Sequence, residues 1–151
     1  MVDSKEYLGN KELLKQKKTA FLASSTIPPD MVLRCYDWAA GKHEGCVVSG
    51  FSSKLEKDVL HFLLKAHCPI ILVLARQMYK TIPEELKEAL GQERLLIIST
   101  STAVRQSKVT ALARNKHICK IADSNLFVGV TANSSLYPLA EEFKQKISSI
   151  T

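Results

Sequence analysis

Aromatic side chains and long apolar runs are both scarce in this sequence of 151 residues. Phe, Trp and Tyr together make up 7% of the chain, and the longest apolar run, residues 69–75, is only long enough for one strand. A helix that spans a bilayer needs ~20 apolar residues, so we expect no membrane-spanning segment and no membrane partner. No apolar stretch follows the charged residues at the start of the chain, which argues against a secretory signal and favours a cytoplasmic protein.

Paired cysteines and metal-binding motifs are missing as well. None of the four histidines belongs to an H-E-x-x-H motif. The four cysteines form no C-x-x-C pair, and each lies in a mainly apolar neighbourhood: Cys35, Cys46, Cys68 and Cys119. We therefore predict reduced, buried cysteines, and neither a zinc site nor any other cofactor.

The sequence also lacks the common catalytic and nucleotide-binding signatures, namely the G-x-S-x-G elbow, the Walker A loop and the G-x-G-x-x-G fingerprint. Acidic residues gather near predicted helix starts, as at Glu84 and Glu85, where the helix dipole accounts for them without catalysis. No pair of residues is placed to serve as acid and nucleophile. These absences predict a binding protein rather than an enzyme, with hydrolysis of a nucleotide-like substrate as the third and weakest interpretation.

Short apolar runs alternate with helical stretches along the chain. The predicted strands cover residues 19–25, 45–50, 69–75, 94–99 and 126–132, and the predicted helices cover 31–42, 54–66, 82–91, 103–123 (interrupted near Asn115) and 137–147. This alternation predicts a doubly wound, mostly parallel five-stranded α/β sheet with helices on both faces, which is a Rossmann-like fold. Residues 1–18 are predicted to be a charged extension, helical or loose, and residues 19–151 a single domain.

Hydroxyl-bearing residues follow most of the predicted strands. Ligands of doubly wound sheets bind outside the carboxyl ends of the strands, where hydroxyls and free amide groups are good partners for phosphate. The alternative is that these residues have only a structural role, since Ser, Thr and Asn commonly cap helices and form turns. The predicted phosphate or nucleotide site contains Ser24, Ser25, Ser49, Gly50, Ser52, Asn133, Ser134 and Ser135.

A cluster of cations lies in the fourth predicted helix. The chain carries a formal charge of +6, which permits binding to a polyanion without requiring it. If the cluster is functional, its charges would neutralise phosphates. The alternative is that it is only a solvated helix face. Its five cations are Arg105, Lys108, Arg114, Lys116 and Lys120, and Asn115 is the sixth predicted contact.

Three segments resemble motifs of the DNA-processing protein A (DprA) family, in the same order and at similar spacing. Residues 47–56 (VVSGFSSKLE) resemble its "vvSG-x-A-x-G-I-D" segment, and residues 112–123 (LARNKHICKIAD) resemble its "RNR-x-I-a-x-L-s-D" segment. Residues 133–136 (NSSL) are similar to its "SGSL" loop. The resemblance covers residues 19–143. The chain departs from the family pattern at Lys54, which replaces a glycine, and at Lys116, which replaces an arginine.

The resemblance implies an extended Rossmann domain that binds single-stranded DNA and helps to load a recombinase during transformation. It also implies a homodimer formed through this domain. By the same resemblance, Ser49, Gly50, Arg114, Asn115 and Lys116 would contact phosphate or DNA.

Two functions therefore stay open at this stage. The first is a protein that binds single-stranded DNA through its backbone phosphates, in DNA uptake or recombination. The alternative is a sensor or carrier domain for a small nucleotide, which needs only the loops at 49–53 and 133–135. The distant lysines separate the two, because only DNA is long enough to reach them.

Overall fold

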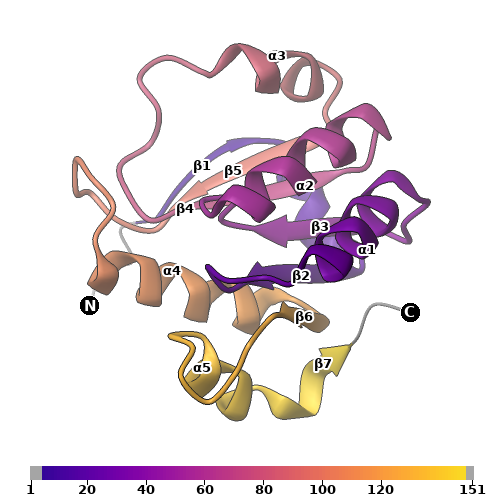
Figure 1. Ribbon diagram of the computed structural model, residues 1–151. Helices are drawn as coiled ribbons and strands as arrows, with labels where there is room; N and C mark the ends of the chain where they lie inside the picture. The colour runs from indigo at the N-terminus through magenta and orange to yellow at the C-terminus, as the bar shows by residue number, and fades with distance from the viewer. Residues whose placement is uncertain (1–4, 149–151) are drawn as a thin grey trace.

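A seven-stranded sheet forms the centre of the structure, a computed structural model that describes residues 5–148 (Figure 1). Its strand order is β1-β5-β4-β3-β2-β6-β7, and all neighbouring strands run parallel except β1, which is antiparallel to β5. The strands are β1 (Glu6–Gly9), β2 (Lys18–Ala23), β3 (Cys46–Ser49), β4 (Ile70–Leu74), β5 (Leu95–Ser99), β6 (Ser124–Val128) and β7 (Ile147–Ser148).

Helices cover both faces of this sheet (Figure 1). The upper face in Figure 1 carries α1 (Pro29–Ala40), α2 (Lys54–Lys65) and α3 (Glu84–Gly91). The lower face carries α4 (Lys108–Ile121) and α5 (Tyr137–Glu142), and the short 3-10 helices are η1 (Lys11–Lys15) and η2 (Lys144–Lys146). No helix within residues 5–148 combines the length and the apolar character needed to cross a membrane.

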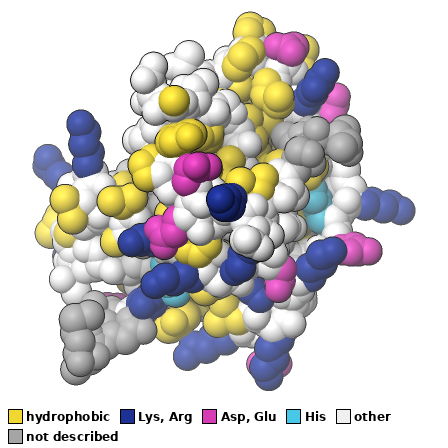
Figure 2. Space-filling model, turned by 90° about the horizontal axis from the view of Figure 1, so that it is seen from below, with side chains coloured by type: hydrophobic (Ala, Val, Ile, Leu, Met, Phe, Trp, Pro, Cys, Tyr) yellow, Lys and Arg dark blue, Asp and Glu magenta, His cyan; other side chains and the backbone are white. Residues whose placement is uncertain are grey.

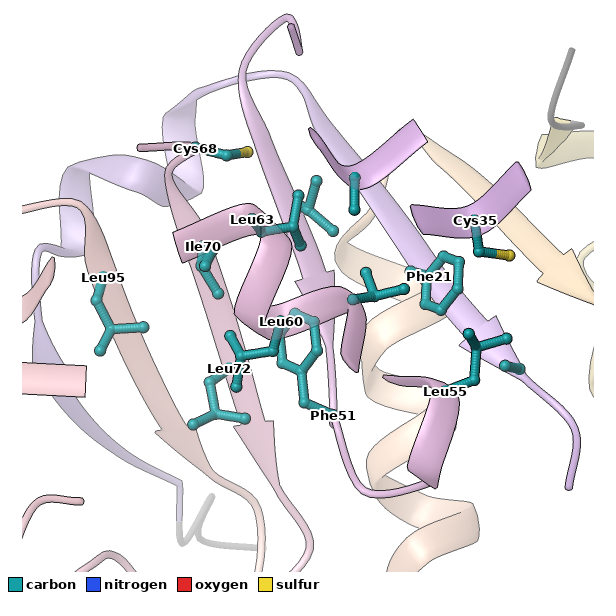
Figure 3. Close-up of a cluster of buried hydrophobic side chains, with 14 of the residues drawn as sticks. Phe21, Cys35, Phe51, Leu55, Leu60, Leu63, Cys68, Ile70, Leu72 and Leu95 are labelled. Carbon is teal, nitrogen blue, oxygen red and sulfur yellow. The ribbon is translucent and has the colours of Figure 1, made fainter. Parts of the chain in front are cut away.

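The core has two layers because the central strands are apolar on both sides. Every residue of β4 and β5 is buried, as expected for parallel strands that are covered by helices on each face. Above the sheet, Phe21 and Ile70 pack against Leu60 and Leu63 of α2 (Figure 3). Below it, alternate strand residues pack against α4, chiefly through Ile118. The four cysteines are buried and free, as predicted.

The Rossmann-like α/β fold is confirmed, with two strands more than the sequence predicts. The five predicted strands correspond to β2 through β6. The additional strands lie at the two edges of the sheet. Neither contains the long apolar run that identifies a strand from sequence, because β7 has only two residues and all four residues of β1 are exposed. Two other expectations are wrong in detail: α4 begins only at Lys108 and runs without interruption through Asn115, and the last helix ends at Glu142.

The segment before β2 belongs to the sheet instead of extending loosely from it. Glu6–Gly9 pair with β5, and the side chain of Leu13 in η1 is buried in the lower core. Asn10 begins η1, since its side chain accepts a hydrogen bond from the backbone N–H of Glu12. The prediction of a helical or loose extension is therefore wrong for the described part of this segment.

The sheet reverses its winding between β2 and β6. From β2 the chain passes through α1 to β3 on one side, whereas β6 is entered from α4 on the opposite face (Figure 1). The two strands pair directly, so the loops that follow them separate at the carboxyl edge of the sheet. Such a switch point is where doubly wound sheets characteristically bind ligands.

Candidate functional site

A crevice lined by hydroxyl groups opens at the switch point between β2 and β6. Its volume is about 430 Å³, and no charged side chain among residues 5–148 lines it. The Ser24 hydroxyl donates to the backbone oxygen of Gly129 at 2.8 Å, which ties the ends of the two strands together. The crevice collects two of the predicted loops, and its lining consists of Ser24, Ser25, Thr26, Gly129, Thr131, Asn133, Ser134 and Ser135.

Gly129 allows the two loops of the crevice to approach each other. Its φ is +68°, a backbone conformation that L-residues with side chains rarely adopt. A methyl group at this position would also overlap the Ile27 side chain and lie 3.1 Å from the Ser24 hydroxyl. The sequence therefore places a glycine where the walls of the crevice are closest.

In the loop after β3, residues 50–53, the flanking side chains of Ser49 and Glu56 occupy three amide groups that could otherwise bind an anion. The backbone N–H of Phe51 donates to Ser49 Oγ at 3.1 Å, and those of Ser52 and Ser53 donate to Glu56 Oε1 at 3.0 and 3.2 Å. Ser49 is fully buried, so the predicted contact between its side chain and phosphate is corrected to an internal role. Phe51 is likewise buried in the upper core.

Glu56 links the start of α2 to the end of β2. Ser53 and Glu56 form a reciprocal capping box, and Glu56 Oε2 also accepts the backbone N–H of Ala23 at 3.0 Å. The carboxylate thus occupies the position at the helix N-terminus that would otherwise attract an anion. The S-x-x-E spacing of Ser53 and Glu56 is the sequence signal of this capping box.

Arg114 lies under this same loop with 3% of its surface exposed. Its guanidinium donates to Asn115 Oδ1 at 2.7 Å, to Ser52 Oγ at 3.3 Å and to the Val73 oxygen at 3.4 Å. Burial lowers the pKa of Arg114 below its ordinary value, and the charge of Glu56 partly offsets that effect. The predicted phosphate contact of Arg114 is therefore corrected to a structural one.

Gly50 provides the space for this arginine. A methyl group on Gly50 would overlap the guanidinium of Arg114, so the backbone and the cation are in direct contact. Gly50 is thus covered from below by protein, and the prediction that it contacts a ligand has no support in this arrangement. Ser52 is half-buried, and its hydroxyl accepts a hydrogen bond from Arg114.

The outer face of α4 presents the other predicted cations to solvent. Lys108, Lys116 and Lys120 are exposed on this helix, and Arg105 is exposed in the loop before it. At 1.5 Å per residue the lysines extend over about 18 Å. Lys116 approaches Glu142 at 3.9 Å, a half-exposed pair that contributes little.

The segment that carries these cations contains no acid. Residues 94–122 include six Lys or Arg residues and neither Asp nor Glu. The view from below shows Lys and Arg side chains spread over this face with fewer acidic ones among them (Figure 2). Because α4 runs back from the carboxyl edge of the sheet, its first turn lies at the same edge as the crevice (Figure 1).

A second hollow lies next to the crevice and shares Ser24 and Ser25 with it. This slot has a volume of about 320 Å³ and separates α1 from the start of α2. Tyr36 donates its hydroxyl to Asp58 Oδ2 at 2.8 Å, and this hydrogen bond is the main reason that the pKa of Tyr36 is raised. Sequence reasoning missed this pair, because no local pattern brings residues of two helices together.

Solved structures of other proteins have a fold similar to that of this chain. A structure of DNA processing protein A (DprA) from Streptococcus pneumoniae superposes on 96% of this chain with a TM-score of 0.77 and 18% sequence identity. The chain has the DprA fold. DprA from Helicobacter pylori, whose structure concerns a single-stranded DNA binding mode, matches over 96% of this chain with a TM-score of 0.72 and 18% identity.

The matched region is only part of each DprA protein. It spans 54% of the pneumococcal DprA chain and 70% of that from Helicobacter pylori. The chain matches no protein-family model and no curated protein sequence. The resemblance to DprA that the sequence motifs suggest is therefore confirmed at the level of the fold.

Proposed function

We propose that the protein binds single-stranded DNA through its phosphate backbone, along the hydroxyl crevice and the outer face of α4. The observation that carries the proposal is the stretch of 29 residues, 94–122, without an acid, whose lysines face solvent on α4. Phosphate contacts by Lys and Arg supply most of the affinity in binding that does not depend on sequence. The contacts would come from Arg105, Lys108, Lys116 and Lys120, together with Ser24, Ser25, Asn133, Ser134 and Ser135.

The likeness to DprA supports the same function. Helicobacter pylori DprA binds single-stranded DNA, and its fold superposes on nearly the whole of this chain. A role in DNA uptake or recombination, a recombinase partner and a homodimer belong to this proposal as well, and they rest on the resemblance in sequence motifs. We also propose that residues 19–151 act as one domain, to which β1 and η1 contribute an edge strand and a core residue.

The proposal is tested by fluorescence anisotropy of a labelled single-stranded oligonucleotide across a salt series. The affinity is expected to fall steeply with salt, by a slope of about 0.7 in log K per phosphate neutralised. Replacing Lys116 and Lys120 by Ala is expected to reduce that slope by about 1.4. Replacing Lys65 and Lys87, exposed lysines on α2 and α3, is the matched control and should leave it unchanged. Absence of binding at low salt would overturn the proposal.

Binding of a small nucleotide is the second candidate, and the neutral crevice favours it. A crevice of about 430 Å³ lined by hydroxyls is large enough for a nucleotide without help from the lysines. Replacing Lys108 and Lys120 by Ala separates the two functions. The substitutions should weaken the binding of DNA but leave the binding of a mononucleotide unchanged.

A further inference from the structure

The slot between α1 and α2 is lined by both aliphatic and polar side chains. Its volume of about 320 Å³ is at the lower end of the range for small-molecule sites. Ile27, Val32 and Leu55 provide aliphatic walls. A nucleobase has two apolar faces and a polar edge, so it matches a hollow that offers both aliphatic side chains and a carboxylate.

The aromatic wall of the slot is fixed before any ligand arrives. The Tyr36 ring packs against Phe62 with 4.9 Å between the ring centroids, and its hydroxyl is held by Asp58. The contact with Phe62 and the hydrogen bond to Asp58 therefore fix the orientations of the Tyr36 ring and of the Asp58 carboxylate. Such preorganisation reduces the entropy that is lost when a ligand binds.

The polar end of the slot is an acceptor with one unused oxygen. Both recorded contacts of the Asp58 carboxylate, from Tyr36 and from Lys54 at 3.5 Å, fall on Oδ2. Among residues 5–148, Oδ1 accepts no hydrogen bond. A carboxylate oxygen can only accept, so it selects a ligand edge that carries a donor.

This acceptor distinguishes nucleobases from one another. Cytosine offers an amino group at N4, and Asp or Glu accept from it, whereas thymine offers a carbonyl oxygen at the equivalent O4. Adenine carries an amino group at N6. A carbonyl oxygen directed at Asp58 would be repelled, and an amino group would be bound.

We propose that the slot holds one nucleobase bearing an exocyclic amino group, with Asp58 as its acceptor and the adjoining phosphate in the hydroxyl crevice. This inference rests on the proposed binding of nucleic acid and adds a base preference at one position. Ser24 and Ser25 line both hollows, so a base and its phosphate can occupy the two together. Lys54, exposed at the slot and paired with Asp58, adds a cation to the slot itself.

The test compares labelled oligo(dC) with oligo(dT) of equal length by fluorescence anisotropy at one salt concentration. Both are pyrimidine strands with the same backbone, and they differ at the edge that would face Asp58. We expect oligo(dC) to bind about tenfold more tightly, the discrimination typical of a good hydrogen bond to a base. Asp58→Asn places an amide at this position, and the preference for oligo(dC) should disappear.

Two further variants test whether the preference for oligo(dC) depends on the Asp58 carboxylate in the slot. Asp37→Asn removes the same charge from an exposed position on α1 outside the slot and should keep the preference. Tyr36→Phe keeps the ring but releases the carboxylate, and it should reduce the preference without abolishing binding. This variant also serves if Asp58→Asn fails to fold.

The outcomes separate this inference from the proposed function. Equal binding of both oligonucleotides, or a preference that survives Asp58→Asn, would overturn the inference and leave the proposed function standing. Titration with dCMP and dTMP, followed by thermal shift, covers the opposite case. Stabilisation by dCMP alone, lost in Asp58→Asn, supports the slot even if no oligonucleotide binds.

Discussion

At the scale of single residues, the close contact between Gly50 and Arg114 allows a direct test of how the loop after β3 is packed. Gly50→Ala inserts a methyl group into the guanidinium of a buried arginine, and overpacking of this kind costs about 1–3 kcal/mol. We expect the free energy of unfolding in urea to fall by that amount. Gly91→Ala is the control, since nothing lies within 4 Å of the added methyl group. Equal stability of the two variants would show that the arginine moves aside freely.

A second residue, Asn125, is buried in β6 without a recorded hydrogen-bond partner for either side-chain polar atom. The alternation along the strand directs it to the lower face, the same side as Phe127. Asn125→Val is expected to raise the free energy of unfolding by about 1–3 kcal/mol, because an unsatisfied buried amide is replaced by an apolar group. Unchanged or lower stability in urea would indicate that a buried water satisfies the amide.

At the scale of elements, α4 depends on a lysine from the end of the chain. Lys146 Nζ donates to the backbone oxygens of Cys119, Lys120 and Ala122 at 3.3, 3.3 and 3.0 Å. A cation at this end also matches the helix dipole. Lys146→Met should lower the free energy of unfolding by about 1 kcal/mol, whereas the same change at exposed Lys144 should not. Thermal unfolding of both variants checks this, and an equal loss would contradict the capping role.

The same helix shows how far the sequence predicts such an element. The five parallel strands were predictable because continuous apolar runs identify strands that are buried on both faces. The supposed interruption at Asn115 was wrong because the polar pair Arg114–Asn115 turns inward to the loop after β3, while Val109 remains 78% exposed. Local patterning cannot show that Arg114 is buried, because its partners Val73 and Ser52 lie 41 and 62 residues away in the sequence.

Within the site, the same limit separates what was predictable from what was not. The hydroxyl loops of the crevice were found because topology brings the ends of parallel strands to one edge. The inward orientation of Ser49 and the pairing of Tyr36 with Asp58 depend on side-chain packing between elements. Sequence spacing carries no record of that packing.

At the scale of the whole molecule, the segment before β2 decides whether the sheet has a protected edge. β1 pairs with β5 from Glu6 to Gly9, and β5 itself is fully buried. Removing residues 1–9 would expose the backbone of an apolar strand, which is a template for association. The loss of ladder hydrogen bonds, at about 1 kcal/mol each, should lower the free energy of unfolding by about 2–4 kcal/mol.

Urea unfolding and light scattering measure the two effects of this deletion. We expect lower stability together with concentration-dependent association, because both follow from the uncovered edge of β5. Removal of residues 1–4 alone is the control, since it leaves every residue of β1 in the chain. If the longer deletion kept the full stability and the oligomeric state of the intact protein, the first residues would be an appendage, and the domain would begin at β2. A stable truncated protein would then also be the shortest form in which to measure binding of DNA.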